Sequence, residues 1–79
     1  MEQRERLGSN LRRLRDERGW SQETLARFAG LHATEVSRLE RGMREPRLST
    51  LVAVAAAFRV TIDELLAPSE AAREPEPVP

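Results

Sequence analysis

The stretch SQETLARFAGLHATEVSRLERG, residues 21–42, places a small residue, a glycine and five apolar residues at offsets that suit two short helices meeting at a sharp angle. Ala26 falls where two such helices approach most closely, and Gly30 can adopt the positive φ that the tight turn between them requires. The pattern predicts a helix-turn-helix unit whose helices cross at about 90–120°. The apolar positions expected to face the core are Leu25, Ala29, Leu31, Val36 and Leu39.

Hydrophobic periodicity predicts a further helix before this unit. Leu7, Leu11 and Leu14 recur at i, i+4 and i+7, which marks an amphipathic helix with charged residues between its apolar positions. We expect that helix to end at Gly19, a left-handed stop, with Trp20 folded back on the core.

Two more helices are predicted after the unit. The run LSTLVAVAAAF, residues 48–58, is apolar on nearly every side, which is typical of a buried central helix. The sequence TIDE, residues 61–64, is a capping box that opens a short fifth helix, and Pro68 ends it. No segment predicts a strand, so we expect an all-α fold of five helices.

Length and composition limit the possible classes of protein. A chain of 79 residues holds one small domain, which we place at residues 1–66, and it has no cysteine to stabilise it. Residues 1–66 carry 12 arginines against 10 acids, whereas residues 67–79 carry 1 arginine against 3 acids. This acidic, proline-rich tail is predicted to be disordered.

The composition also argues against several functions. One histidine, no cysteine, no glycine-rich phosphate loop and no paired buried acids leave nothing for catalysis, a cofactor or a metal site. No segment is apolar enough to span a membrane, and the charged N-terminus is unlike a signal peptide, so we expect a cytoplasmic protein.

Three segments carry a resemblance to a known family: LRRLRDERGWSQETLA at residues 11–26, VSRLERGMREP at residues 36–46, and LVAVAAAFRVTIDELL at residues 51–66. Together they resemble the Cro/phage-repressor type of helix-turn-helix domain, the XRE family. The resemblance implies a compact five-helix repressor-like domain and a transcription regulator that binds double-stranded operator DNA as a homodimer. Restriction-modification controllers, phage repressors of the Cro size and antitoxins match the chain about equally well.

The outward face of the third helix, expected to begin near His32, is the candidate for reading bases in the major groove. Arg38 is the strongest candidate because its guanidinium matches guanine O6 and N7, and its loss should cost about 1–3 kcal/mol of discrimination at that base pair. Glu35 could accept a hydrogen bond from cytosine N4, but it could equally sit back on the helix N-terminus or pair with Arg38. The candidates for base contacts are Ala33, Thr34, Ser37 and Arg38.

Candidate phosphate contacts flank that helix. Ser21 is a good N-cap for the second helix, whose free N–H groups and Gln22 are placed to bind phosphate, as family members use them. His32 is either a plain cap or a further phosphate contact. The loop arginines would follow the DNA backbone, although they could instead only solubilise the loop. They are Arg41, Arg44 and Arg47.

The family pattern also implies structural roles. It places an ion pair at Arg15 and Glu40 that ties the first helix to the third, and breaking such a buried pair costs about 3–5 kcal/mol. His32 departs from the family's usual serine or threonine. Arg59 stands where the family usually has glycine between the fourth and fifth helices, so the turn there can differ, because positive φ is costly for other residues.

The fifth helix is the candidate dimer interface. The family commonly dimerises there, which assigns the contact to Val60, Ile62 and Leu66, while Leu65 is expected to close the core. Alternatively, all four side chains close the monomer core. The competing function is a protein-interaction module of the same fold, an antitoxin or antirepressor-like protein, but the arginines on and after the third helix favour DNA.

Overall fold

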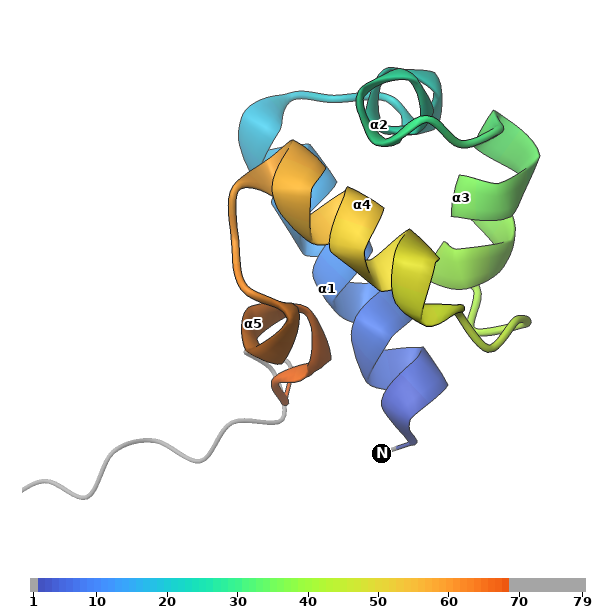
Figure 1. The fold of residues 1–79 in the computed structure, drawn as a ribbon, viewed down its shortest axis with the longest axis vertical. Coiled ribbons are helices and arrows are strands. Elements are labelled where there is room, and N and C mark those ends of the chain that lie inside the picture. Colours follow the sequence, from blue (N-terminus) through green and yellow to red (C-terminus); the bar gives the residue numbers. More distant parts are fainter. Residues whose placement is uncertain (1, 69–79) are drawn as a thin grey trace, which may run out of the picture.

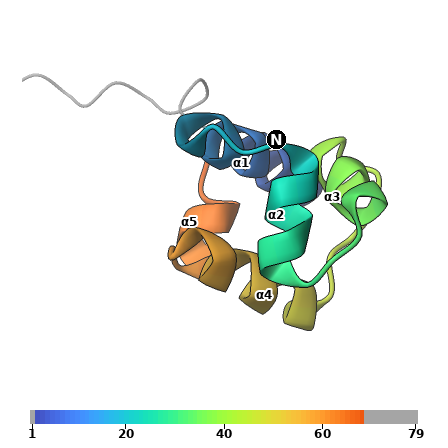
Figure 2. The ribbon, with the colours of Figure 1, turned by 90° about the horizontal axis from the view of Figure 1, so that it is seen from above.

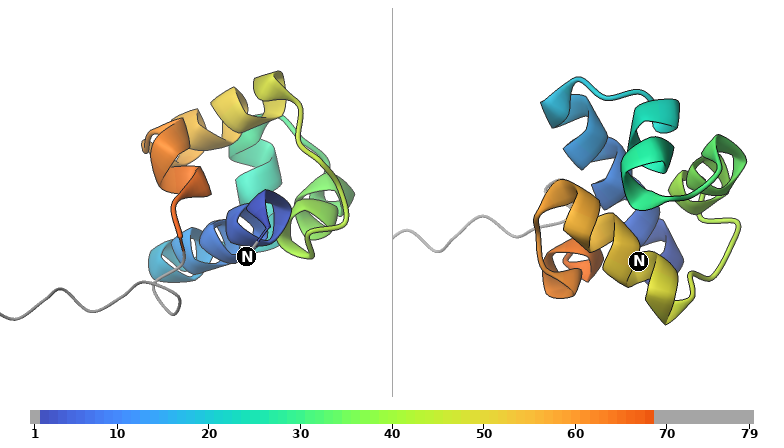
Figure 3. Two further views of the ribbon diagram at one scale, coloured as in Figure 1. Left: turned by 90° about the horizontal axis from the view of Figure 1, so that it is seen from below. Right: turned by 45° about the horizontal axis from the view of Figure 1, so that its top comes forward.

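Five helices pack in a ring around one core in the computed structural model, which describes residues 2–68 (Figure 1). The helices are α1 (Gln3–Arg18), α2 (Gln22–Ala29), α3 (Ala33–Glu40), α4 (Leu48–Phe58) and α5 (Ile62–Leu66). Helix α1 packs on α3 and α5, α2 packs on α3 and α4, and α4 also packs on α5. The left view of Figure 3 shows this ring, with α1 and α4 on opposite sides of it. The predicted all-α fold of five helices is confirmed, and no strand occurs between residues 2 and 68.

Left-handed residues end three of the helices. Gly19 after α1 has φ 68°, Gly30 after α2 has φ 69°, and Arg59 after α4 has φ 59°. The predicted stop at Gly19 and the predicted positive φ at Gly30 are confirmed. Arg59 adopts the left-handed conformation that suits the glycine usually found at this position in the family. The turn into α5 therefore keeps a left-handed residue although that residue carries a side chain.

This strained turn makes Arg59→Gly a stability test. We expect the free energy of unfolding to rise by up to about 1 kcal/mol, because left-handed backbone costs other residues about 1–2 kcal/mol. Glycine also makes the unfolded chain more flexible, which offsets about 0.5–1 kcal/mol of the stability gained by relieving the strain. Urea unfolding followed by Trp20 fluorescence measures the change. Arg59→Ala keeps the strain and is the matched control; a glycine variant no more stable than the alanine variant would contradict the strained turn.

The apolar faces of all five helices meet in the core. Trp20 packs against this core as predicted, with its ring stacked on Phe58 at a centroid distance of 5.3 Å. Leu65 is fully buried and closes the core, as expected, whereas Ile62 and Leu66 are half-buried. The buried hydrophobic residues are Leu7, Leu11, Leu14, Leu25, Ala26, Val36, Leu39, Val54, Ala55, Phe58 and Leu65.

Asn10 is the one buried polar residue in the described part of the chain, and it holds the end of α5. Its Nδ2 donates to the carbonyl oxygens of Leu65 at 2.7 Å and Ala67 at 2.8 Å. Because a buried amide without partners is costly, this pair of bonds fixes α5 against α1. Of the tail predicted at residues 67–79, Ala67 and Pro68 are therefore seen at the end of α5, and residues 69–79 lie outside the described residues.

The prediction that residues 48–58 form a buried helix is wrong for one face of α4. Leu48 is 71% exposed and Val52 is 52% exposed, and Ala56 continues the same exposed row at i, i+4 and i+8. The reason is the place of α4 at the rim of the ring, where it packs on α2 and α5 with its inner face only. A helix that is apolar on every side, such as α4, is therefore not necessarily buried on every side.

Candidate nucleic-acid interface

The turn between α2 and α3 sets the direction of α3. Ala26 is 4% exposed, so its small side chain is enclosed by the helix packing, and Gly30 carries the chain through the left-handed turn. Val36 and Leu39 anchor the underside of α3, with 0% and 3% of their surfaces exposed. Figure 2 shows α3 at the edge of the molecule beside α2. Both predicted core positions of α3 are therefore confirmed, which fixes the opposite face toward solvent.

The outward face of α3 carries three of the four side chains that the sequence analysis assigned to base contacts. Thr34 and Arg38 are exposed and Ser37 is half-buried, whereas Ala33, also expected to face outward, is half-buried and packs against the core. Arg38 forms no ion pair with any acid in residues 2–68. Among the described residues, its guanidinium therefore has no acidic partner that a DNA base would have to displace.

The sequence left three roles open for Glu35: a contact with cytosine, a contact with the helix N-terminus, or a pair with Arg38. In the structure its side chain folds back onto the N-terminus of α3. The backbone N–H of His32 donates to Glu35 Oε1 at 3.1 Å, one half of a capping arrangement. His32 is the N-cap of α3, as expected, and its imidazole is exposed. Glu35 therefore stabilises the start of α3, where the helix dipole favours a negative charge.

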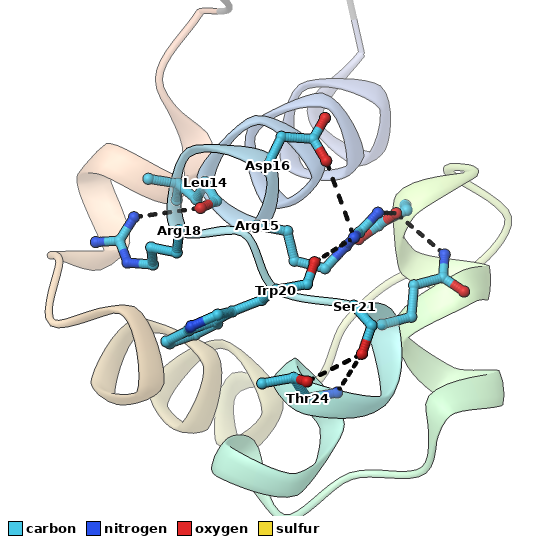
Figure 4. A network of polar contacts seen from close by, with 9 residues as sticks. Leu14, Arg15, Asp16, Arg18, Trp20, Ser21 and Thr24 are labelled. Carbon is cyan, nitrogen blue, oxygen red and sulfur yellow. Dashed lines mark hydrogen bonds and ion pairs between the residues drawn. The ribbon is translucent and has the colours of Figure 1, made fainter.

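The predicted ion pair between Arg15 and Glu40 joins α1 to the end of α3 (Figure 4). Arg15 Nε donates to Glu40 Oε2 at 2.5 Å and Nη2 donates to Oε1 at 3.1 Å, so the contact is bidentate. Only 12% of the arginine side chain and 5% of the glutamate side chain are exposed. Arg15 Nη1 also donates to the carbonyl oxygen of Trp20 at 2.7 Å. The hydrogen bond to Glu40 raises the pKa of Arg15 above its ordinary value.

The same network reaches the start of α2. Gln22 Nε2 donates to Glu40 Oε1 at 3.1 Å, so Glu40 holds both an arginine of α1 and the first residue of α2. The Ser21 hydroxyl accepts from the Thr24 backbone N–H at 3.0 Å and caps α2. Ser21 is exposed and Gln22 is half-buried. The bond between Gln22 and Glu40 was not predicted, because 18 residues separate the two.

Two of the loop arginines, Arg44 and Arg47, line a hollow of about 400 Å³ between α3 and the start of α4. Ser49 and Thr50 of the first turn of α4 and Glu35 of α3 line it as well. Arg47 is the N-cap of α4 and makes no side-chain capping bond, so first-turn N–H groups of α4 have no side-chain acceptor there. Arg41 is exposed, and its Nε donates to the Ser37 carbonyl oxygen at 3.4 Å.

Gly8 is a structural residue of this site that the sequence analysis missed. A Cβ built on Gly8 would overlap the Glu40 carbonyl oxygen and lie 2.7 Å from that of Leu39. Glycine therefore allows the backbone of α1 to approach the last turn of α3. The available signal was a glycine inside an amphipathic helix, where alanine would be about 1 kcal/mol more favourable.

Two other features are absent from the described part of the chain. In residues 2–68, no helix is both long and apolar enough to cross a membrane. Within the same range, no three acidic, histidine or cysteine side chains come together in a way that could hold a metal ion.

Comparisons with known proteins agree with the helix-turn-helix fold. The helix-turn-helix family model HTH_3 matches residues 11–65. The chain is 40% identical over 70 residues to y4dJ of Sinorhizobium fredii, an uncharacterized HTH-type transcriptional regulator, covering 89% of this chain and 91% of the relative. The hypothetical transcription factor NHTF from Neisseria superposes with a TM-score of 0.82 at 41% identity, over 89% of this chain and 80% of that chain.

A controller protein is also similar in structure. The restriction-modification controller protein C.AhdI from Aeromonas hydrophila superposes with a TM-score of 0.75 at 39% identity, over 78% of this chain and 94% of that chain. The family match covers more than half of this chain, and it includes the whole helix-turn-helix unit. The chain therefore belongs to the XRE-type helix-turn-helix family of DNA-binding transcriptional regulators, whose members are not enzymes.

Proposed function

We propose that this regulator acts in the cytoplasm as a homodimer that inserts α3 into the major groove of a palindromic operator. The observation that carries the proposal is the two-sided character of α3. Its underside is anchored by Val36 and Leu39, while Thr34 and Arg38 are exposed on the other side. A helix held in this way can enter the groove while its core packing stays intact, and its side chains reach base edges.

In this proposal the groups around α3 bind the phosphates on both sides of the groove. Arg44 and Arg47, with the uncapped start of α4, form one anion-binding hollow. Ser21 and Gln22 lie at the start of α2, His32 lies directly before α3, and Arg41 follows α3. Gln22 keeps its place through the bond to Glu40, which leaves its second amide hydrogen for phosphate.

The proposed dimer uses the surface around α5. Val60, Ile62 and Leu66 are half-buried and pack against the core, so each keeps part of its apolar surface exposed. A symmetric partner would cover this surface and set two α3 helices about 34 Å apart, one turn of DNA. Asn10 supports the arrangement because it fixes α5 on α1.

Selection of bound sequences from a random DNA pool, using the full chain, tests the proposal. We expect an inverted repeat whose half-sites are centred about one helical turn apart. Uniformly weak, salt-sensitive binding with no shared motif would contradict the proposal and favour the protein-interaction module.

Replacement of a loop arginine should weaken DNA binding without changing which sequence is preferred. We expect Arg44→Ala to lower affinity equally for all sequences and to reduce the salt slope by about 1 for each phosphate that the variant no longer binds. Titrations between low and high salt measure that slope. Arg59→Gln is the matched control because Arg59 lies at the opposite end of α4. An unchanged slope in Arg44→Ala would remove this residue from the phosphate contacts.

A further inference from the structure

A second surface feature lies apart from α3, between the ends of α1, α2 and α4. It is a shallow cleft of about 640 Å³. Its floor is aromatic: the Trp20 ring lies 4.9 Å from Phe28 and 5.3 Å from Phe58, centroid to centroid. Phe28 is 57% exposed although it is apolar. In Figure 4 the Trp20 ring and Arg18 lie on the other side of the α1–α2 connection from Ser21.

The cleft continues into the exposed apolar row of α4. Ala56 lines the cleft, and Val52 and Leu48 follow it at one-turn intervals toward the start of the helix. No element in residues 2–68 covers this row. The cleft and the row together form an apolar surface without a partner in the described part of the chain.

The charge of the cleft is positive, and no acid in residues 2–68 neutralises it. Arg18 is held in place by bonds to the carbonyl oxygens of Leu14 and Phe58, and its guanidinium lies 5.0 Å from the Phe58 ring centroid. Arg59 lines the other side. Neither arginine pairs with an acid in residues 2–68. The complementary charge in this chain is at residues 69–79, which contain three glutamates and one arginine.

The end of the described chain is fixed on the face of α1 that carries Arg18. The Ala67 carbonyl accepts from Asn10, and Asn10, Leu14 and Arg18 follow one another at i, i+4 and i+8 along one face of α1. Arg18 is therefore about 12 Å from Asn10 along the helix. Eleven residues can span up to about 35 Å when extended, so residues 69–79 reach the cleft with length to spare.

We propose that residues 69–79 bind in this cleft, with glutamates on Arg18 and Arg59 and with proline and valine against Trp20 and Phe28. Proline-rich segments suit aromatic grooves because their extended conformation is already restricted. A short tether gives the segment an effective concentration of roughly millimolar, so even weak surface ion pairs suffice. A segment with no core of its own would be ordered by this contact.

A spin label at the end of the full chain tests this directly. The sequence has no cysteine, so Pro79→Cys gives a single attachment site in ¹⁵N-labelled protein. We expect selective loss of peak intensity at the Trp20 indole and at the amides of Phe28 and Arg59. Evenly distributed loss, or loss concentrated on α3, would overturn the proposal; the second result would place the acidic segment over the DNA-binding helix.

Matched variants test whether the selective loss depends on ionic contacts of the glutamates or only on the short distance between the segment and the cleft. Replacing Glu70, Glu74 and Glu76 together by glutamine should abolish the selective loss, whereas Arg73→Gln should retain it. Arg59→Gly should reduce it without unfolding the domain, since the backbone there suits glycine. Equal loss in all these variants would contradict the ionic contact. A mixed sample tests whether the contact lies within one chain. It combines spin-labelled chains without ¹⁵N and ¹⁵N-labelled chains without a spin label. Loss of peak intensity at Trp20 in this sample would show that the segment binds to another chain, which would overturn the intramolecular proposal.

Discussion

Glu40→Ala should destabilise the domain by about 3–5 kcal/mol, the largest effect expected from any single substitution discussed for this chain. The variant leaves the guanidinium of Arg15, 12% exposed, without its bidentate partner. It also releases Gln22 at the start of α2. A domain of this size has a net stability of only about 3–5 kcal/mol from its core, so we expect substantial unfolding at room temperature. Urea unfolding followed by Trp20 fluorescence and circular dichroism measures the loss.

The control for this prediction is an ion pair of the same kind on the surface. Glu17 pairs with Arg13 at 3.0 Å one helical turn away, and 53% of the glutamate side chain and 36% of the arginine side chain are exposed. Glu17→Ala should therefore cost no more than about 0.5 kcal/mol. Equal losses in the Glu17 and Glu40 variants would contradict the structural role of the buried pair. Replacing Arg15 and Glu40 together by Met and Leu should recover stability, because a buried pair is often replaceable by packed apolar groups.

Gly8→Ala should destabilise the domain by about 1–3 kcal/mol, although alanine is the better helix former. The added methyl group meets the carbonyl oxygens of Glu40 and Leu39, which are backbone atoms and cannot rotate away. Helices α1 and α3 must move apart, which has the cost of an overpacked core. The same shift would strain the Arg15–Glu40 contact, since it joins the same two helices.

The matched substitution is Ser9→Ala, at the next position of α1 on the solvent side. Without a steric conflict, alanine should leave stability unchanged or raise it slightly, according to its helix propensity. A Gly8 variant that is stabilised like the Ser9 variant would show that α1 and α3 do not approach closely. Both are measured by the same unfolding experiment, at several protein concentrations so that any dimerisation is separated from folding.

Local patterns were enough to predict most of the fold. Helix ends depend on neighbouring residues, so Gly19 and Gly30 could be assigned as left-handed stops from the sequence, and both are. The spacing of Val36 and Leu39, which are 0% and 3% exposed, predicted the buried side of α3. The ion pair of Arg15 and Glu40 came from the resemblance to the family, since no spacing rule links residues 25 positions apart.

What the sequence could not predict depends on how helices are placed relative to one another. The exposed row with Leu48 and Val52 was missed because an all-apolar helix gives no sign of which side will lack a partner. Gly8 and the contact between Gln22 and Glu40 were missed because close approach of distant segments is a tertiary property. The assignments of base contacts, phosphate contacts and the dimer interface remain predictions for experiment.

The most direct measurement of the central claim compares wild type and Arg38→Ala on the selected operator and on operators with single base-pair changes. We expect the variant to lose discrimination at one guanine in each half-site by about 5- to 150-fold, the equivalent of about 1–3 kcal/mol, and to keep it at the other base pairs. Arg44→Ala should instead weaken binding to every operator alike. Unchanged discrimination at every base pair in the Arg38 variant would contradict the claim that α3 reads the operator through this side chain.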